Sequence, residues 1–285
     1  MANQPVEKFN DGAQNVINMV LGAKGQGRHP LKSLLNGSWL GHPLHPVITD
    51  VAIGGAVFAA LFDVAWLAFP VTRGWAPRAA EVALIAGVVG MLGAIITGLA
   101  DWSDTFGKER TTGFVHGTLN TLALLVYIVS MVLRLQLSDG KSVTAAILGF
   151  VGVGLITVAA YFGGDMAFKF GTNVNHTAWE HGSDDFETIM PIANVPENQL
   201  VRVMVGGVPV LLIRQGEKLA AISATCTHAG GPLDEGTLAG DVVRCPWHGS
   251  RFHVNTGKIV DGPATVAAPR YDVQVRDGQV ALKRH

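Results

Sequence analysis

Four long apolar runs, at about 46–70, 80–100, 114–133 and 143–163, dominate the N-terminal part of this 285-residue chain. Each run has roughly the 20 residues that an α-helix needs to cross the hydrocarbon core of a bilayer. Glycine and alanine are dense within the runs, and small residues let membrane helices approach closely. Hydrophobic residues form 48% of the chain and charged residues only 15%, and four such runs are hard to bury in a soluble bundle. We therefore predict an α-helical transmembrane four-helix bundle over residues 41–170.

Residues 1–40 are predicted to form an N-terminal amphipathic segment. Apolar side chains recur at helical spacing between residues 5 and 22. They are Val6, Phe9, Ala13, Val16, Ile17 and Val20. We expect this helix to lie on the membrane face or against the C-terminal domain. The segment contains neither the apolar core of a secretory signal nor a twin-arginine pair.

Residues 187–285 have the pattern of a small all-β domain, because short runs of strand-forming residues alternate with glycine-containing turns. The predicted strands are Leu200–Val205, Val208–Arg214, Leu219–Ile222, Val242–Cys245, Phe252–Val254 and Tyr271–Val275. Residues 171–186 are polar. We predict that they link the bundle to this domain.

The strongest motif pairs one cysteine with one histidine in each of two segments. Cys226-Thr-His228 is followed, after sixteen residues, by Cys245-Pro-Trp-His248, and the chain has no other cysteine. A [2Fe–2S] centre with two cysteines on one iron and two histidines on the other needs this supply of ligands. Structural zinc sites also accept two cysteines and two histidines, but they usually pair like with like along the sequence. We therefore predict a histidine-ligated iron–sulfur cluster in a reducing compartment.

Residues 187–283 resemble a Rieske ferredoxin domain. Cys226-Thr-His-Ala-Gly-Gly-Pro-Leu233 and Cys245-Pro-Trp-His-Gly-Ser-Arg-Phe252 are similar to its two cluster-binding loops, and Gly262-Pro263-Ala264 is similar to its proline loop. The resemblance implies reversible one-electron transfer. Cys226 and Cys245 would hold the ferric iron, and His228 and His248 the iron that becomes ferrous. It also implies that the histidine edges face the redox partner and that the midpoint potential falls with rising pH.

The surroundings of the cluster in this family are matched only in part. High-potential members have a disulfide between the two loops, whereas the matching positions here are Gly231 and Trp247. Those members also hydrogen-bond the cluster through a serine and a tyrosine. Ser250 matches the serine, but Phe252 stands at the tyrosine position. Hydrogen bonds to sulfur raise the potential, so with one donor left we expect a low-to-intermediate potential.

Polar side chains inside the predicted helices are costly and mark candidate sites. They are His42, His45, Asp63, Asp101, His116 and Asn120. The His-Pro-Leu-His-Pro opening, Asp101-Trp102 and His116 with Asn120 resemble a family of four-helix membrane domains without an assigned function, over residues 38–175. Three interpretations stand side by side. The bundle holds a b-type haem between His116 and His45 or His42, or it forms a quinone pocket, or His116, Asp63 and Asn120 satisfy one another.

An even number of spanning helices places both chain ends on one side of the membrane. Six basic residues lie near helix ends on that side, and four lie on the other. The first group is Lys24, Arg28, Lys32, Lys108, Arg110 and Lys169, and the second is Arg73, Arg78, Arg134 and Lys141. This excess favours a multi-pass protein of the cell membrane with a cytoplasmic β domain.

The sequence thus predicts a membrane-anchored one-electron carrier that acts with a redox partner protein, and with haem or quinone in the bundle. The alternatives are an electron-transfer subunit of a quinone-linked or oxygenase/reductase complex, and a redox-sensing anchor. The formal net charge of −1 gives no support to a nucleic-acid partner, and no nucleotide- or flavin-binding fingerprint is present. His176 and His181 faintly resemble the iron-binding pair of Rieske oxygenases, and we interpret them as linker histidines.

Overall fold

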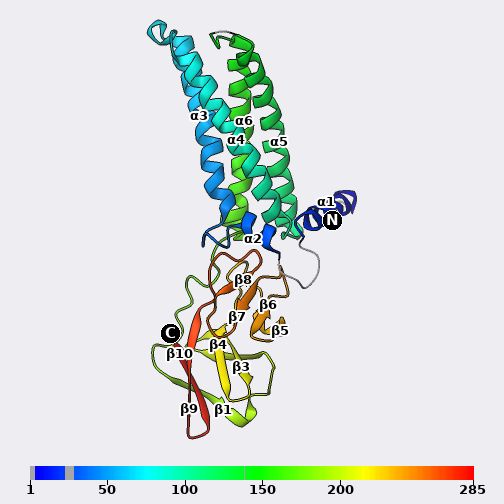
Figure 1. The fold of residues 1–285 in the computed structure, drawn as a ribbon, viewed down its shortest axis with the longest axis vertical. Coiled ribbons are helices and arrows are strands. Elements are labelled where there is room, and N and C mark those ends of the chain that lie inside the picture. The colour runs from blue at the N-terminus through cyan, green and yellow to red at the C-terminus, as the bar shows by residue number, and fades with distance from the viewer. Residues whose placement is uncertain (1–3, 23–28, 138) are drawn as a thin grey trace. The chain divides into compact units, whose positions relative to one another are not determined.

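The computed structural model describes residues 4–22, 29–137 and 139–285, which form two compact units (Figure 1). One unit contains helix α1 (Gln4–Val20) and Leu44–Phe170. The other contains the described residues of Leu21–Pro43 together with Gly171–His285. The N-terminal 40 residues are therefore divided between the two units. Lys24, Arg28 and the side chain of Val6 lie outside the described residues.

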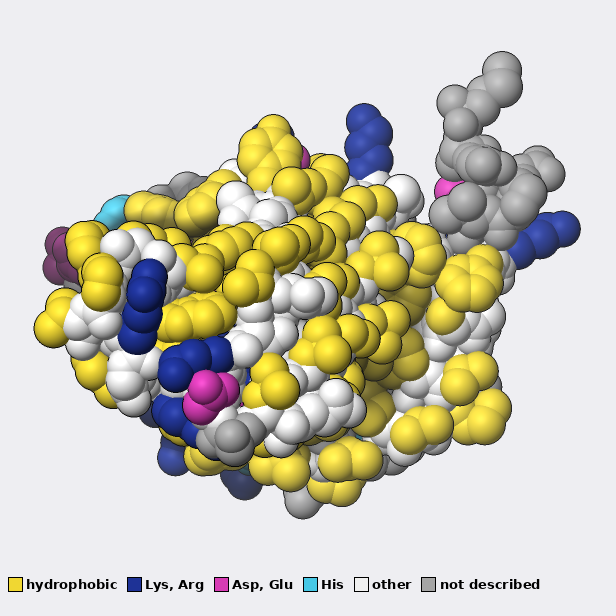
Figure 2. All heavy atoms as spheres, turned by 90° about the horizontal axis from the view of Figure 1, so that it is seen from above, with side chains coloured by type: hydrophobic (Ala, Val, Ile, Leu, Met, Phe, Trp, Pro, Cys, Tyr) yellow, Lys and Arg dark blue, Asp and Glu magenta, His cyan; other side chains and the backbone are white. Residues whose placement is uncertain are grey.

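The first unit is a bundle of four long helices, as predicted. Their bounds are Leu44–Ala68 (α3), Ala76–Trp102 (α4), Gly107–Leu135 (α5) and Val143–Phe170 (α6), and a short 3-10 helix lies at Pro70–Thr72 (η1). All four long helices have the length and composition to cross a membrane. Large apolar side chains remain exposed along them, among them Val51, Phe58, Leu125 and Val158. Seen from above, hydrophobic side chains also outnumber charged ones (Figure 2). Exposed apolar side chains along the helices suit lipid rather than water.

Small residues set the spacing between the helices. A Cβ at Gly55 of α3 would lie 2.4 Å from the backbone nitrogen of Gly87 in α4, and one at Gly90 would lie 2.7 Å from that of Ala52. The two backbones therefore touch, and a larger side chain at these positions would push them apart. The glycines that fill the apolar runs are thus packing residues.

A buried ion pair joins α3 to α5. Arg134 donates from Nη1 and Nη2 to the two carboxylate oxygens of Asp63 at 2.9 and 2.5 Å, and neither side chain is more than 1% exposed. Arg134 is therefore not a surface charge. It should not be counted among the basic residues near helix ends from which the membrane orientation was predicted. The expectation that Asp63 shares a site with His116 is also wrong, because Asp63 lies about 27 Å of helix beyond His45.

Helix α1 confirms the predicted amphipathic helix and packs on the bundle of its own unit. The Gln14 amide donates to the carbonyl oxygens of Trp102 and Thr105 at 2.8 and 2.9 Å, where α4 ends. The rings of Phe9 and Phe114 meet edge to face with centroids 5.7 Å apart. Part of the apolar stripe of α1 stays exposed.

The second unit contains two antiparallel sheets, which confirms the predicted all-β domain. The larger sheet has the strand order β1-β10-β9-β4-β3-β2, and the smaller has the order β5-β6-β7-β8. Short 3-10 helices lie at Ile192–Asn194 (η2) and Leu233–Glu235 (η3). The strands are Glu187–Pro191 (β1), Val201–Val205 (β2), Val208–Gln215 (β3), Lys218–Ser223 (β4), Thr237–Ala239 (β5), Val242–Arg244 (β6), Arg251–His253 (β7), Ile259–Asp261 (β8), Arg270–Arg276 (β9) and Gln279–Arg284 (β10).

Strand β3 is buried on both faces and separates two cores. Successive side chains of a strand point to opposite faces. Leu211 and Ile213 accordingly enter a core that also contains the two cysteines, while Val210 and Leu212 enter a second core. The cysteines are therefore anchored in the hydrophobic interior of the unit.

Two segments outside the sheets complete this unit. One contains the short helix α2 (Pro30–Asn36), and the other is the predicted linker, residues 171–186. In the second segment, the His176 N–H donates to the Thr227 carbonyl at 3.2 Å, and the Ser223 hydroxyl donates to the Glu180 carboxylate at 2.7 Å. The predicted linker is thus bound to the β unit along much of its length.

Candidate metal centre

Two loops of the β unit have the same hydrogen-bonded turn. Residues 226–231 follow β4, and residues 245–250 join β6 to β7. In each loop, the N–H four residues after the cysteine donates to the cysteine carbonyl, and the cysteine N–H donates to the carbonyl five residues on. The distances are 2.9 and 2.8 Å around Cys226, and 3.2 and 2.8 Å around Cys245. The unequal spacing of cysteine and histidine in the two motifs is accommodated inside a common turn.

These turns group the four side chains by type. The thiols of Cys226 and Cys245 are 1% and 2% exposed, form no disulfide, and share a hydrogen bond. The imidazoles of His228 and His248 are half-buried and meet edge to face with centroids 5.0 Å apart. The Nδ1 atom of His228 is buried without a hydrogen-bond partner among the described residues. Cysteine thus lies beside cysteine, and histidine beside histidine.

The protonation states of these groups suit metal ligands. Burial, followed by the nearby His248 and Lys32, lowers the pKa of His228 to about 3. Burial and then Lys32 lower the pKa of His248 to about 4. The hydrogen bond between the two thiols raises the pKa of Cys226 and lowers that of Cys245 to about 7. Neutral imidazoles and a readily ionised thiol are what a metal centre with these ligands requires.

Ser250 ties the second loop to its neighbours. Its hydroxyl is fully buried, hydrogen-bonds the Cys226 sulfur, and accepts the Ala264 N–H at 3.2 Å. Phe252 is also fully buried and offers no hydroxyl, whereas Trp247 is half exposed. Ser250 is therefore a hydrogen-bond donor to this sulfur, and Phe252 contributes only apolar packing.

Comparison with known proteins shows what this arrangement belongs to. Residues 186–272 match the Rieske [2Fe-2S] domain. Over 76 residues, which are 27% of this chain and 71% of the relative, the chain is 43% identical to ferredoxin CarAc of Metapseudomonas resinovorans. The chain belongs to the Rieske [2Fe–2S] family.

Further relatives of the Rieske domain differ in length. The 3-phenylpropionate/cinnamic acid dioxygenase ferredoxin subunit of Escherichia coli K12 is 35% identical over 93 residues, which are 32% of this chain and 87% of that subunit. Apoptosis-inducing factor 3 of Mus musculus is 30% identical over 96 residues, which are 34% of this chain but only 16% of that protein. Residues 41–176 match a second family, described as predicted membrane protein (DUF2231). The fusion of these two families confirms the architecture predicted from the sequence.

Glycines make room in the Rieske domain where its loops meet. A Cβ at Gly231 would lie 2.8 Å from the Cys245 sulfur and 3.1 Å from the Trp247 ring. Gly262 has φ +98°, and a Cβ there would lie 2.6 Å from the Cα of Ser250. Paired thiols, paired imidazoles and a buried imidazole nitrogen without a partner form a donor set that fits a [2Fe–2S] cluster.

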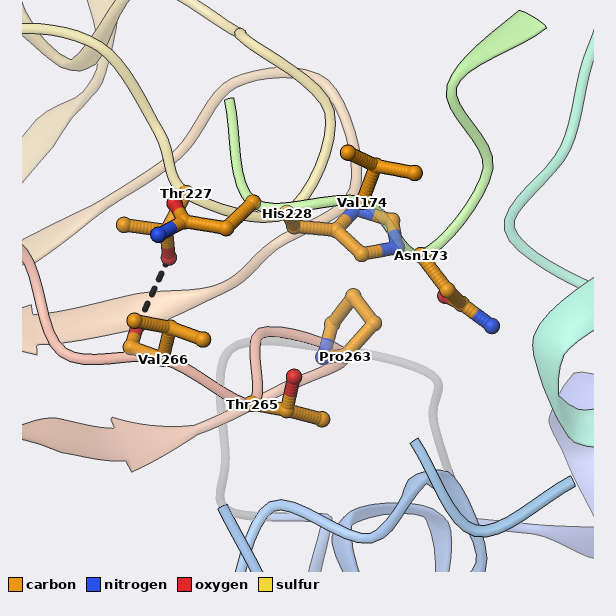
Figure 3. Close-up of a pocket in the computed structure, with 8 residues that line it drawn as sticks. Asn173, Val174, Thr227, His228, Pro263, Thr265 and Val266 are labelled. Atoms are coloured by element: carbon orange, nitrogen blue, oxygen red, sulfur yellow. Dashed lines mark hydrogen bonds between the residues drawn. The ribbon is translucent and has the colours of Figure 1, made fainter. Parts of the chain in front are cut away.

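A small, shallow pocket adjoins His228 (Figure 3). Residues 173–175 line one side of it, and Pro263 of the proline loop lines another. The Thr227 hydroxyl donates to the Val266 carbonyl at 2.7 Å, which joins the first cluster loop to the segment after Pro263. The ring of His228 therefore borders a pocket that is lined on one side by residues 173–175.

Sequence reasoning missed two side chains that act on the histidine pair. The ring of His176, which we interpreted as a linker histidine, lies against the first loop, 3.3 Å from where a Cβ at Gly230 would be. Lys32, on α2, is buried. Both contribute to the lowered pKa of His228. Neither residue carries a local signal, because only the fold brings these distant segments to the loops.

Two polar residues of the bundle also meet. The rings of His45 on α3 and His116 on α5 lie edge to face with centroids 6.3 Å apart. Each Nδ1 donates to a backbone carbonyl, that of Ala94 at 2.9 Å and that of Ala159 at 2.8 Å. Because a carbonyl only accepts, each Nδ1 carries the hydrogen and each Nε2 is left as an acceptor. The amide nitrogen of Asn120 lies 3.2 Å from the Nε2 of His116.

The other candidate residues of the bundle lie elsewhere. His42 is exposed, belongs to the other unit, and has its Nδ1 2.8 Å from the Pro43 carbonyl oxygen. Asp101 lies in the last turn of α4, and Asp63 is bound to Arg134. The structure therefore brings together His45, His116 and Asn120, without Asp63.

Proposed function

We propose that this protein is a membrane-anchored one-electron carrier, and that Cys226, His228, Cys245 and His248 bind its [2Fe–2S] cluster. The pairing of buried thiols and adjacent imidazoles on two equivalent loops carries the proposal. When bound, such a cluster takes up and releases one electron. The thiolates would hold the iron that stays ferric, and the imidazoles the iron that becomes ferrous. Ser250 donates to a ligand sulfur and so favours the more negative, reduced state.

The relatives and the apolar helices indicate the partners. Two relatives are named as ferredoxins, and one of them is a dioxygenase subunit. Their names support exchange of electrons with a separate redox protein, such as a reductase or an oxygenase. The four apolar helices and the membrane family support anchoring in the cell membrane. Without the buried Arg134 and Lys32, five basic residues against three still favour a cytoplasmic Rieske domain.

Metal analysis and EPR of the full-length protein in detergent test the ligand set. Anaerobically purified protein should hold two irons and two acid-labile sulfides per chain, and dithionite should produce the EPR signal of a histidine-ligated cluster. Cys226→Ser and His248→Ala should lose the signal. His181→Ala is the matched control, because this imidazole is exposed, and it should keep the signal. Zinc in place of iron, or a signal that survives His248→Ala, would refute the assignment.

We also propose that His45 and His116 would hold a b-type haem, which would supply a second one-electron site in the bundle. A histidine that binds metal commonly donates its other ring N–H to a carbonyl, as both residues do. The two rings lie on facing helices with centroids 6.3 Å apart. Gly98 and Gly163 let the two rings lie against helix backbones, because a Cβ there would fall 2.8 and 2.9 Å from them.

A reduced-minus-oxidised optical spectrum of the detergent-purified protein tests the haem proposal. Sharp Soret and α bands should appear above the broad bleaching of the cluster. His116→Ala and His45→Ala should abolish the bands, while His42→Ala, which alters an exposed imidazole, should keep them. Cluster bleaching without haem bands would refute haem, and it would leave a bundle that is an anchor or a pocket for a quinol whose hydroxyl groups donate to the same two Nε2 atoms. Extraction and chromatography of bound quinone would then follow.

A further inference from the structure

Helix α2 is inverted relative to an ordinary amphipathic helix. Its polar residues Lys32 and Asn36 are 4% and 2% exposed, whereas Leu31 and Leu34 are 44% and 51% exposed. The spacing of four places Lys32 and Asn36 on one helix face, and that face is turned into the protein. Burying a cation is costly unless hydrogen bonds and an opposite charge compensate it. Lys32 therefore places a positive charge in the interior of the unit.

The loop after β8 holds α2 in place. The His29 N–H donates to Asp261 Oδ2 at 2.6 Å, and the Ser33 hydroxyl donates to the other oxygen of the same carboxylate. The Gly262 N–H donates to the Ser33 hydroxyl at 3.2 Å, and the Ser38 hydroxyl donates to the Gly262 carbonyl at 2.8 Å. Because Gly262 also packs on the second cluster loop, these bonds fix α2 relative to the proposed ligands.

Lys32 acts on the histidine side of the site. Its charge is among the causes that lower the pKa of both His228 and His248. Arg244, in contrast, acts on Cys245. Geometry agrees with this placement, because α2 is bonded to Gly262, Gly262 packs on the loop that carries His248, and Lys32 lies on the buried face of α2.

We propose that Lys32 is a built-in cation that raises the reduction potential of the cluster, an inference that rests on the ligand set proposed above. Two ferric ions, two sulfides and two thiolates sum to zero, so the cluster with neutral imidazoles becomes −1 on reduction. A cation fixed beside the imidazoles stabilises that charge. The Asp261 carboxylate acts in the opposite direction, but Ser33 and two backbone N–H groups hold it.

The expected effect is large enough to measure. A unit charge about 10 Å from the added electron, at an effective dielectric constant of about 20, changes the reduction equilibrium roughly tenfold. For a one-electron couple this is about 59 mV. Lys32→Gln should lower the midpoint potential by that order, and Lys32→Arg, which keeps the charge, should stay near the wild type.

Voltammetry of the cluster-loaded full-length protein in detergent, at one pH near neutrality, tests this. Lys218→Gln is the matched control, since Lys218 is an exposed lysine of the same unit, and it should leave the potential unchanged. The EPR signal of each variant reports whether its cluster is intact. An intact cluster with an unchanged potential in Lys32→Gln would overturn the proposal.

Lys32→Met covers the case in which Lys32→Gln fails to load a cluster. It removes the charge, keeps an unbranched side chain, and leaves the hydrogen bonds of Ser33 to Asp261 and Gly262 in place. A lowered potential in this variant supports the proposal, and an unchanged potential contradicts it. A wild-type protein without a [2Fe–2S] signal would instead refute the proposed function, so the two failures are distinguishable.

Discussion

Neutralising Asp63 tests the energetics of the bundle. Its two bonds to Arg134, at 2.9 and 2.5 Å, place both charges in the buried interior. With charge centres about 4 Å apart and an effective dielectric constant of about 20, the attraction is about 4 kcal/mol. Removing one partner of a buried pair typically costs about 3–5 kcal/mol, because the other charge is left uncompensated. Asp63→Asn should therefore lower the free energy of unfolding by about 4 kcal/mol, close to a thousandfold in the folding equilibrium.

Urea unfolding of the full-length protein in detergent, followed by tryptophan fluorescence, measures this loss, and buried Trp66 on α3 is a suitable reporter. The double variant Asp63→Leu with Arg134→Leu removes both charges and should recover most of the stability. The visible absorbance of the cluster is an internal control for the Rieske domain. A loss under about 1 kcal/mol in Asp63→Asn, or a double variant less stable than either single one, would refute the reasoning.

Three further predictions concern the Rieske domain. Gly231→Ala should strip the cluster, because its methyl group would lie 2.8 Å from the Cys245 sulfur; iron and sulfide analysis should show less than the wild-type content. Ser250→Ala should lower the midpoint potential, because its hydroxyl hydrogen-bonds the Cys226 sulfur; an unchanged voltammogram would contradict this. In cluster-free protein, burial lowers the pKa of His228 from 6.5 to about 3. The unfolded chain therefore binds more protons, and stability should fall as the pH drops through this window. Urea midpoints at about pH 7 and 5 measure the slope, which His228→Gln should reduce.

Elements with a regular pattern were predictable from the sequence. Runs of about 20 apolar residues mark α3 to α6 because a spanning helix must be apolar over its length. Six strands were predicted near their observed positions, and β3 matches closely because it is buried on both faces. Strands β1, β5, β8 and β10 were not predicted. Strands β5 and β8 have three residues each, too few to show alternation on their own. They are hydrogen-bonded to β6 and β7 in the smaller sheet.

Contacts between distant charged residues were not predictable. Arg134 lies at the end of an apolar run and has the appearance of an interfacial cation, and only helix packing places Asp63 against it. Lys32 likewise has the appearance of a surface charge until α2 is attached to Asp261. The cysteine and histidine motifs were found because each segment carries its own dense local signal. Residues that act on them from 171–186 and from α2 carry none.

The attachment of α2 to the proline loop has a consequence for biosynthesis. Ser33 and Asp261 are 228 residues apart in the chain. At about 5–20 residues per second, the ribosome makes the second partner roughly 10–45 s after the first. All four bundle helices are synthesised in that interval. During this time α2 has no Asp261 carboxylate to bind. Helix α2 can therefore attach to the Rieske domain only after Asp261 and Gly262 have been synthesised. A fragment that begins after the bundle contains no α2.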